Sequence, residues 1–174
     1  MRETYITEKN VIGSSMIETE DGFCILTYTS TDGKHFLKTK DRFETVCEEW
    51  VLPLEDITAA ANLIRLSDGS LMTTIKVLSE NPEVAKISGA SFYAAFSDDN
   101  GKSFKDFVKI TQKMSCYYLM NNRIIRTHSG RLLIPVCYIP DEFISEEFFE
   151  KIGWAGCFYS DDEGKSWKES EKQI

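Results

Sequence analysis

One pattern that occurs twice in this chain of 174 residues constrains its fold more than any other feature. Residues 97–104 and 160–167 both read Ser-x-Asp-x-Gly-Lys-Ser-aromatic. Serine and aspartate side chains hydrogen-bond to nearby backbone groups in turns, and glycine accepts a positive φ without steric cost. Each copy follows a β-type run, at 91–96 and at 155–159, so the pattern predicts a turn between antiparallel strands. We assign its defining residues to structure and not to catalysis: Ser97, Asp99, Gly101, Phe104, Ser160, Asp162, Gly164 and Trp167.

A second repeated segment precedes each complete copy of this turn. Residues 62–72 align with 123–133, and both segments read as a strand, a tight glycine turn and a strand. Two hairpins in each unit give four consecutive antiparallel strands, which is the composition of one propeller blade. Arg65 and Arg126 hold equivalent positions in two units, which indicates a shared structural task such as bridging adjacent blades.

The sequence therefore predicts an all-β chain, a single partial β-propeller domain over residues 1–174. About three four-stranded blades are expected, in units of about 14–40, 60–110 and 121–174.

The first unit is less regular than the other two. Residues 30–36 resemble a degenerate copy of the turn, and Gly22 precedes them by the distance at which Gly89 precedes Ser97. Gly22 is accordingly matched to the later turn of a unit, so we expect the chain to begin in mid-blade, with 16–20 as a second strand. The first blade is predicted to be incomplete.

Composition and charge narrow the partners. A net charge of -8 repels phosphate backbones and the basic residues form no stripe, so no nucleic acid partner is expected. No apolar run approaches the roughly 20 residues that span a bilayer, so no membrane partner is expected. No secretion signal is seen, so we expect a cytoplasmic protein as the sequence stands, or a secreted one if the chain is an internal fragment. The five cysteines include no Cys-x-x-Cys pair, so we read them as buried apolar residues and expect no metal site and no cofactor.

Three segments together resemble the bacterial sialidases and their BNR (Asp-box) relatives. Residues 117–123, then 129–135, then the turn at Ser160 occur in the order those relatives use, and the resemblance covers roughly residues 60–174. It implies a six-bladed propeller in which an arginine triad binds the sialic acid carboxylate, an aspartate is the acid/base, and a tyrosine assisted by a glutamate is the nucleophile. The Arg-Ile-Pro tripeptide that usually carries the first arginine is absent, and the nucleophile usually lies in later blades. The resemblance thus implies that this chain holds only part of the site.

The ligand face of a propeller lies at the starts of the innermost strands, opposite the turns described above. Arg123 is the preferred contact for a carboxylate or hydroxyl because a guanidinium offers paired donors. Asp56, in an approaching loop, is the candidate general acid, and these two residues form the predicted catalytic set. The predicted substrate-binding residues lie near the same strand starts: Asn62, Tyr117, Tyr118, Asn121 and Asn122.

These assignments have structural alternatives. Arg123 could instead be buried or cap neighbouring loops, and Asp56 could be an ordinary loop carboxylate. Tyr117 and Tyr118 could stack on a sugar, yet one of two consecutive strand residues must point into the core.

Three units fill the chain, whereas a closed ring of six would need on the order of 350 residues. We therefore expect either the remaining half of the propeller in a longer protein or a second copy that forms a homodimer. The leading function is glycoside hydrolysis of the exo-α-sialidase type, acting on a glycan or sialic-acid-like sugar. The alternative is a non-catalytic Asp-box propeller that binds carbohydrate or serves as a scaffold, and the sequence leaves open whether the chain is an enzyme. A glycosidase for a related acidic sugar is a third hypothesis.

Overall fold

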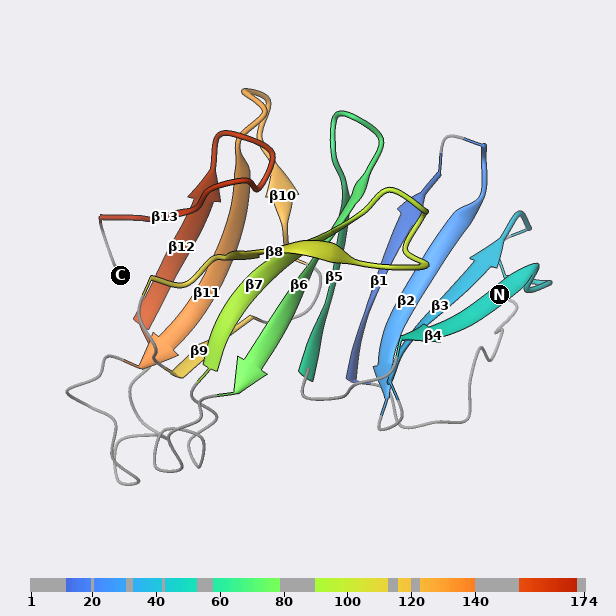
Figure 1. Ribbon diagram of the computed structural model, residues 1–174, viewed down its shortest axis with the longest axis horizontal. Helices are drawn as coiled ribbons and strands as arrows, with labels where there is room; N and C mark the ends of the chain where they lie inside the picture. The colour runs from blue at the N-terminus through green and yellow to red at the C-terminus, as the bar shows by residue number, and fades with distance from the viewer. Residues whose placement is uncertain are drawn as a thin grey trace, which may run out of the picture.

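The computed structural model describes residues 12–19, 21–30, 33–41, 43–52, 58–78, 90–112, 116–119, 123–139 and 154–171. These residues form strands β1 to β13 and no helix, and the strands lie in three antiparallel sheets set in a row (Figure 1). Accordingly, the described part of the chain contains no helix long and apolar enough to cross a membrane. The expected all-β class is confirmed.

Each sheet is built from consecutive strands. Sheet 1 contains β1 (Ile12–Glu18), β2 (Cys24–Ser30), β3 (Gly33–Thr39) and β4 (Glu48–Leu52). Sheet 2 contains β5 (Thr58–Arg65), β6 (Leu71–Leu78), β7 (Ala90–Ser97) and β8 (Lys105–Lys109). Sheet 3 contains β9 (Cys116–Tyr118), β10 (Ile125–Arg126), β11 (Leu132–Ile139), β12 (Trp154–Ser160) and β13 (Lys168–Glu169). In sheet 3, β9 and β10 pair with different parts of β11 and together occupy one edge position. The three sheets do not close into a ring.

The first sheet is complete, which corrects the prediction that the chain begins in mid-blade. β1 pairs with β2 through the turn at Gly22, so this glycine belongs to the first hairpin of its unit and not to a later one. The first hairpin of every sheet is closed by two backbone hydrogen bonds in equivalent positions. The bond that spans four residues is the one from Thr19 N to Phe23 O (2.7 Å) in sheet 1, from Leu66 N to Ser70 O (2.8 Å) in sheet 2 and from Thr127 N to Arg131 O (2.9 Å) in sheet 3.

The two repeated turns share one hydrogen-bond pattern, and we call this structure the Ser-Asp turn. Ser97 Oγ donates to Asp99 Oδ1 (2.7 Å) and accepts from the Gly101 N–H (2.7 Å). Asp99 also accepts from the Ser103 N–H (2.9 Å) and hydroxyl (2.6 Å). Residues 160–167 repeat these four bonds. Burial alone would raise the pKa of Asp99, but the hydrogen bonds from the two serines outweigh it and lower the pKa to about 2.

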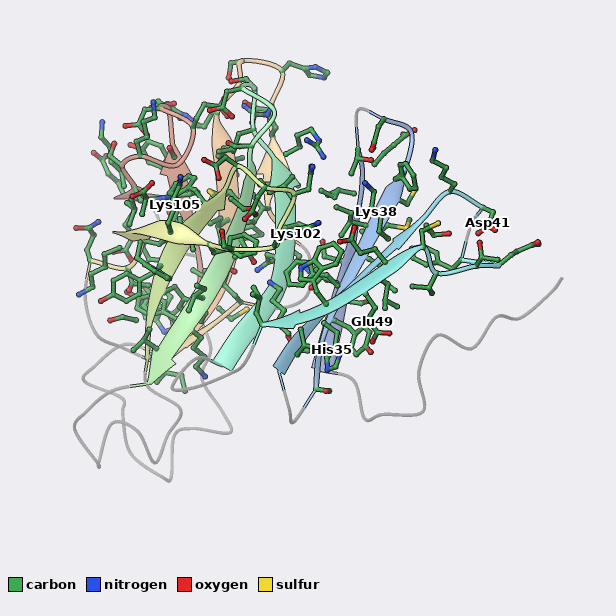
Figure 2. The ribbon with its side chains drawn as sticks, turned by 45° about the vertical axis from the view of Figure 1, so that its right-hand side comes forward. His35, Lys38, Asp41, Glu49, Lys102 and Lys105 are labelled. Atoms are coloured by element: carbon green, nitrogen blue, oxygen red, sulfur yellow. The ribbon has the colours of Figure 1, made fainter. Side chains whose placement is uncertain are left out.

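Sheet 1 has a Ser-Asp turn of its own, between β3 and β4, where the sequence did not indicate one. Thr39 Oγ1 donates to Asp41 Oδ1 (2.8 Å) and accepts from the Phe43 N–H (3.2 Å), and the Thr45 N–H donates to the same carboxylate oxygen (2.9 Å). Asp41 lies just beyond the end of β3 (Figure 2). The expected copy at 30–36 is wrong, because β2 and β3 pair up to Ser30 opposite Gly33 and the Ser-Asp hydrogen bonds form after β3 instead.

Two apolar clusters fill the spaces between successive sheets. Ile25 and Phe36 of sheet 1 pack on Leu63 and Leu71 of sheet 2. A larger cluster joins sheets 2 and 3, and its fully buried members include Met72, Phe92, Ala94, Leu132, Ile134 and Phe158. Burying side chains of this size contributes about 1.5–3 kcal/mol each. Cys47 and Cys137 are exposed, so the expectation that the cysteines are buried is wrong for these two.

The arginine that ends the first strand of sheets 2 and 3 binds the preceding sheet, as its repeated position predicted. Arg65 donates to Gly69 O in its own hairpin (2.6 Å) and to Glu18 O in sheet 1 (3.3 Å). Arg126 donates to Gly130 O in its own hairpin (3.2 Å) and to Arg65 O in sheet 2 (3.4 Å). One side chain thus fixes a turn and the spacing of two sheets.

Candidate functional site

The first strands of the three sheets, β1, β5 and β9 with β10, lie next to one another. We call this side of the row of sheets the inner edge, and the described candidate residues come from it. β1 packs against β5, and Ser15 Oγ donates to Leu63 O (3.5 Å). On the other side of β5, the backbone N–H of Arg123 donates to Asn62 Oδ1 (3.0 Å). The structure therefore brings together two of the predicted site residues from different sheets.

Asn62 is held on every side. Its amide group donates to Thr74 Oγ1 (2.8 Å), its amide oxygen accepts from the Arg123 backbone, and its side chain has no exposed surface. The Thr73 hydroxyl donates to the Asn62 carbonyl oxygen (2.6 Å). A buried amide bound in this way positions the backbone at Arg123, and the geometry does not support a direct contact between Asn62 and a substrate.

Arg123 is the described candidate best placed to meet a ligand. Its side chain is exposed, and it lies between β9 and β10, where the inner strand stops pairing with β11. Within the described ranges no hydrogen bond or ion pair of its guanidinium is found. An exposed guanidinium is suited to an anionic or hydroxyl-rich ligand.

Of the other predicted site residues, Tyr117 is buried, Tyr118 is described only in its backbone, and three lie outside the described residues. Tyr117 is 1% exposed, and its ring centroid lies 5.5 Å from those of Tyr138 and Phe158, so its ring belongs to the core between sheets 2 and 3. The backbone of Tyr118 pairs with Cys137, and its side chain is not described. Asp56, Asn121 and Asn122 lie outside the described residues.

Lys34 is a buried lysine that sequence analysis did not single out. It lies on β3 with 3% exposure, and its ammonium group donates to Thr73 Oγ1 across the boundary between sheets 1 and 2. Burial lowers the pKa of Lys34 to about 7. Through Thr73 and Asn62, hydrogen bonds connect Lys34 of sheet 1 to Arg123 of sheet 3. The sequence does hold a signal for this burial. Lys34 precedes Phe36 by two residues in a β-type run, and residues two apart in a strand share a face, so a lysine on the apolar face could have been expected.

Among the eight named residues of the two Ser-Asp turns, Gly101, Phe104 and Gly164 contact the preceding sheet, Gly164 through Met72 and Phe96. The Trp50 indole of sheet 1 donates to Gly101 O (2.7 Å), and Lys102 Nζ pairs with Glu48 (2.7 Å; Figure 2 labels Lys102). Phe104 stacks at an angle on Phe36, with centroids 6.0 Å apart. In sheet 3, Trp167 is buried and its indole donates to Gly164 O (2.9 Å).

Metal ligands do not cluster in the part of the chain that the structure describes, where no three His, Cys, Asp or Glu side chains gather. At the inner edge the described residues offer hydrogen bonding and the charge of Arg123, supported by the buried hydrogen bonds of Asn62.

Comparison with known proteins gives a likeness of structure only. No family model matches the sequence and no curated protein matches it significantly. A Hadza microbial sialidase, Hz136, aligns with a TM-score of 0.63 at 14% identity over 92% of this chain and 37% of that chain. A Trypanosoma rangeli sialidase aligns with a TM-score of 0.65 at 13% identity over 95% of this chain and 31% of its own. The same enzyme in complex with 2,3-difluorosialic acid, described as a covalent intermediate, gives a TM-score of 0.64 at 13% identity over 94% and 31%.

These alignments establish a sialidase-like fold. The chain spans about a third of the length of the sialidases it resembles.

Proposed function

We propose that this chain contributes part of a sialic-acid-binding site of the sialidase type, with Arg123 as the contact for the sugar carboxylate. The observation that carries the proposal is the exposed guanidinium of Arg123, fixed through its backbone to Asn62 at the inner edge of a sialidase-like fold. An arginine offers a carboxylate two parallel donors. A local arginine attracts an anion even in a chain whose net charge is -8.

The same proposal extends to the rest of the sequence-based prediction. The three Ser-Asp turns are Asp-boxes of the BNR type, and the three sheets are blades of a larger propeller whose other blades carry the nucleophile. Asp56 is the candidate acid, and Tyr118, Asn121 and Asn122 are further sugar contacts. The reaction is exo-α-sialidase hydrolysis, completed by parts of the site that this chain does not supply.

A second candidate is carbohydrate binding without catalysis. It is favoured by the burial of Asn62 and Tyr117, which leaves Arg123 as the exposed side chain among the described predicted site residues. A site with one arginine can hold an acidic sugar without cleaving it.

Binding and turnover separate these functions. We would titrate the chain with N-acetylneuraminic acid while following NMR chemical shifts, and assay it with a fluorogenic sialoside. Arg123→Ala removes a paired carboxylate contact of about 1.5–3 kcal/mol, so binding should weaken by roughly 10- to 100-fold. Arg131→Ala is the matched control, because this exposed arginine already pairs with Asp161 (2.6 Å).

The outcomes are distinct. Binding that depends on Arg123, with turnover, supports the sialidase; the same binding without turnover in the chain and in any longer gene product supports the non-catalytic function. Absence of binding, or binding that is equal in wild type and Arg123→Ala, removes the proposed site.

A further inference from the structure

A chain of hydrogen bonds crosses sheet 2 and joins sheet 1 to the backbone at Arg123. On the side of sheet 1, the Lys34 ammonium group donates to Thr73 Oγ1, and the Thr73 hydroxyl donates to the Asn62 carbonyl oxygen (2.6 Å). On the side of sheet 3, the Asn62 side chain accepts from the Arg123 backbone N–H (3.0 Å). We call these four residues the relay. Lys34, Thr73 and Asn62 are 3%, 2% and 0% exposed, so water does not replace a hydrogen bond that is lost there.

Lys34 and Thr73 occupy positions where the repeat elsewhere places apolar core residues. The pairing of the strands makes Phe92 of sheet 2 the counterpart of Lys34, and Ile134 of sheet 3 the counterpart of Thr73. Phe92 and Ile134 both belong to the apolar cluster between sheets 2 and 3. Burying a lysine costs free energy that burying an apolar side chain does not. Packing therefore does not account for this polar pair, and its hydrogen bonds lead to Arg123.

The proton of Lys34 determines which way the relay runs. An ammonium group has three donors and no acceptor, so the Thr73 oxygen accepts from it and the Thr73 hydrogen points to Asn62. A neutral amine carries a lone pair, which gives the Thr73 hydroxyl a second acceptor and lets it turn away from Asn62. Burial lowers the pKa of Lys34 to about 7, which places this change near neutral pH.

The described titratable side chains on the strands around Lys34 divide by face, because successive residues of a strand alternate. Those on its own face of sheet 1, or on the side of sheet 2 that faces it, are Lys38, Glu48, Arg65 and Tyr93. Those on the opposite faces are Cys24, Tyr28, His35, Glu49 and Lys76. Lys38 pairs with Asp21 (3.2 Å) and Glu48 pairs with Lys102 (2.7 Å). Burial is the cause of the lowered pKa of Lys34.

We propose that Lys34 is a positioning residue for Arg123, acting through Thr73 and Asn62, and that its proton sets the backbone geometry at Arg123. Protonated Lys34 holds the Arg123 backbone in place, and the neutral form loosens it. The consequence for binding rests on the proposed function, in which Arg123 contacts the sugar carboxylate: the site should bind an anionic sugar more tightly at mildly acidic than at mildly basic pH.

The first test follows the backbone N–H of Arg123 by NMR as the pH passes through about 7, and it needs no sugar. The chemical shift should change with a midpoint near the Lys34 pKa of about 7 in the wild type and stay constant in Lys34→Met. Thr73→Val, which removes the hydroxyl, should abolish the change as well. Thr73→Ser keeps the hydroxyl and should retain it.

Lys38→Met is the matched control. Lys38 lies on the same strand and the same face as Lys34, toward the other end of β3 from His35 (Figure 2), and it pairs with Asp21 instead of Thr73. This variant should keep the wild-type transition at Arg123.

The second test compares the affinity for N-acetylneuraminic acid at mildly acidic and mildly basic pH. One hydrogen bond gained in the relay should make wild-type binding roughly 2- to 10-fold tighter below the transition than above it. Lys34→Met should bind equally at both pH values, and Lys38→Met should keep the wild-type ratio.

An Arg123 shift without a transition near pH 7, or one that titrates equally in the wild type and Lys34→Met, overturns the inference. If Lys34→Met does not fold, the contrast between Thr73→Val and Thr73→Ser decides: equal transitions in both overturn the inference. Wild-type affinity that is equal at both pH values, in a chain that binds the sugar, overturns the link between the relay and the site. A chain that shows the transition but binds no sugar supports the relay and contradicts the proposed function, so the two failures are distinguishable.

Discussion

Replacing Asp99 by alanine should destabilise the protein far more than replacing its neighbour Asp98. Asp99 accepts three hydrogen bonds, from the Ser97 hydroxyl (2.7 Å), the Ser103 N–H (2.9 Å) and the Ser103 hydroxyl (2.6 Å). A hydrogen bond to a charged group contributes about 1.5–3 kcal/mol when buried. Because the turn is partly exposed, we discount the sum and expect Asp99→Ala to lose about 2–3 kcal/mol of unfolding free energy. Asp98 makes one exposed ion pair with Lys105 (2.7 Å), so Asp98→Ala should cost much less than Asp99→Ala.

Urea unfolding of both variants at pH 7 measures this difference, and its pH dependence tests the cause. The folded pKa of Asp99 is about 2, below its ordinary value of 3.8. A lowered pKa of an acid contributes stability that is present above the unfolded value and is lost as the pH falls through the folded value. The gap between wild type and Asp99→Ala should therefore narrow between about pH 4 and pH 2. Equal losses in the two variants, or a gap that does not change with pH, would show that the hydrogen bonds to Asp99 do not stabilise the folded state.

Three further predictions concern stability. Gly164→Ala should lower the free energy of unfolding by about 1 kcal/mol more than Gly130→Ala. Both glycines have a positive φ, but of the two only Gly164 has an atom close to the added Cβ, the Met72 sulfur at 2.6 Å, and thermal unfolding of both variants checks this. Asn100→Glu should stabilise by about 0.5–1 kcal/mol, because Glu163 holds the equivalent turn position in sheet 3 and pairs with Arg126, the counterpart of Arg65. The buried Nη2 of Arg65 has no hydrogen-bond partner among the described residues, and an unchanged midpoint in urea would contradict the prediction. The unfolding free energy of the wild type should rise between about pH 7 and 10.5, because the unfolded chain keeps the Lys34 proton over that interval while the folded chain has lost it. Lys34→Met should remove this rise, and a wild-type stability that is flat over the interval would contradict the prediction.

The parts of the fold that sequence analysis predicted correctly are those that leave local, repeated chemistry. The turns at Ser97 and Ser160 keep serine, aspartate and glycine at fixed spacing, and the second and third sheets follow from them. The turn of sheet 1 was missed because threonine replaces serine and Phe43 takes the left-handed conformation that usually requires glycine. A search for hydroxyl-x-Asp-x-x-x-hydroxyl, without the glycine, would have found Asp41.

The candidate site was less predictable because it depends on contacts between sheets. Alternation along a strand indicates that one of Tyr117 and Tyr118 points inward, but only packing of sheet 3 on sheet 2 decides that Tyr117 is in the core. Asn62 looks like a ligand contact in sequence, whereas its partners Thr74 and Arg123 come from a neighbouring strand and a neighbouring sheet.

In sheets 2 and 3 the glycine of the Ser-Asp turn is seated on the sheet before it. A NOESY spectrum of the labelled protein tests this directly, because the Gly101 and Gly164 α-protons report on their neighbours. We expect cross-peaks from Gly101 to the Phe36 ring and from Gly164 to the Phe96 ring, because atoms of these rings lie 3.2 and 3.3 Å from the Cβ position of the respective glycine. Cross-peaks from these glycines only to residues of their own sheets would contradict it.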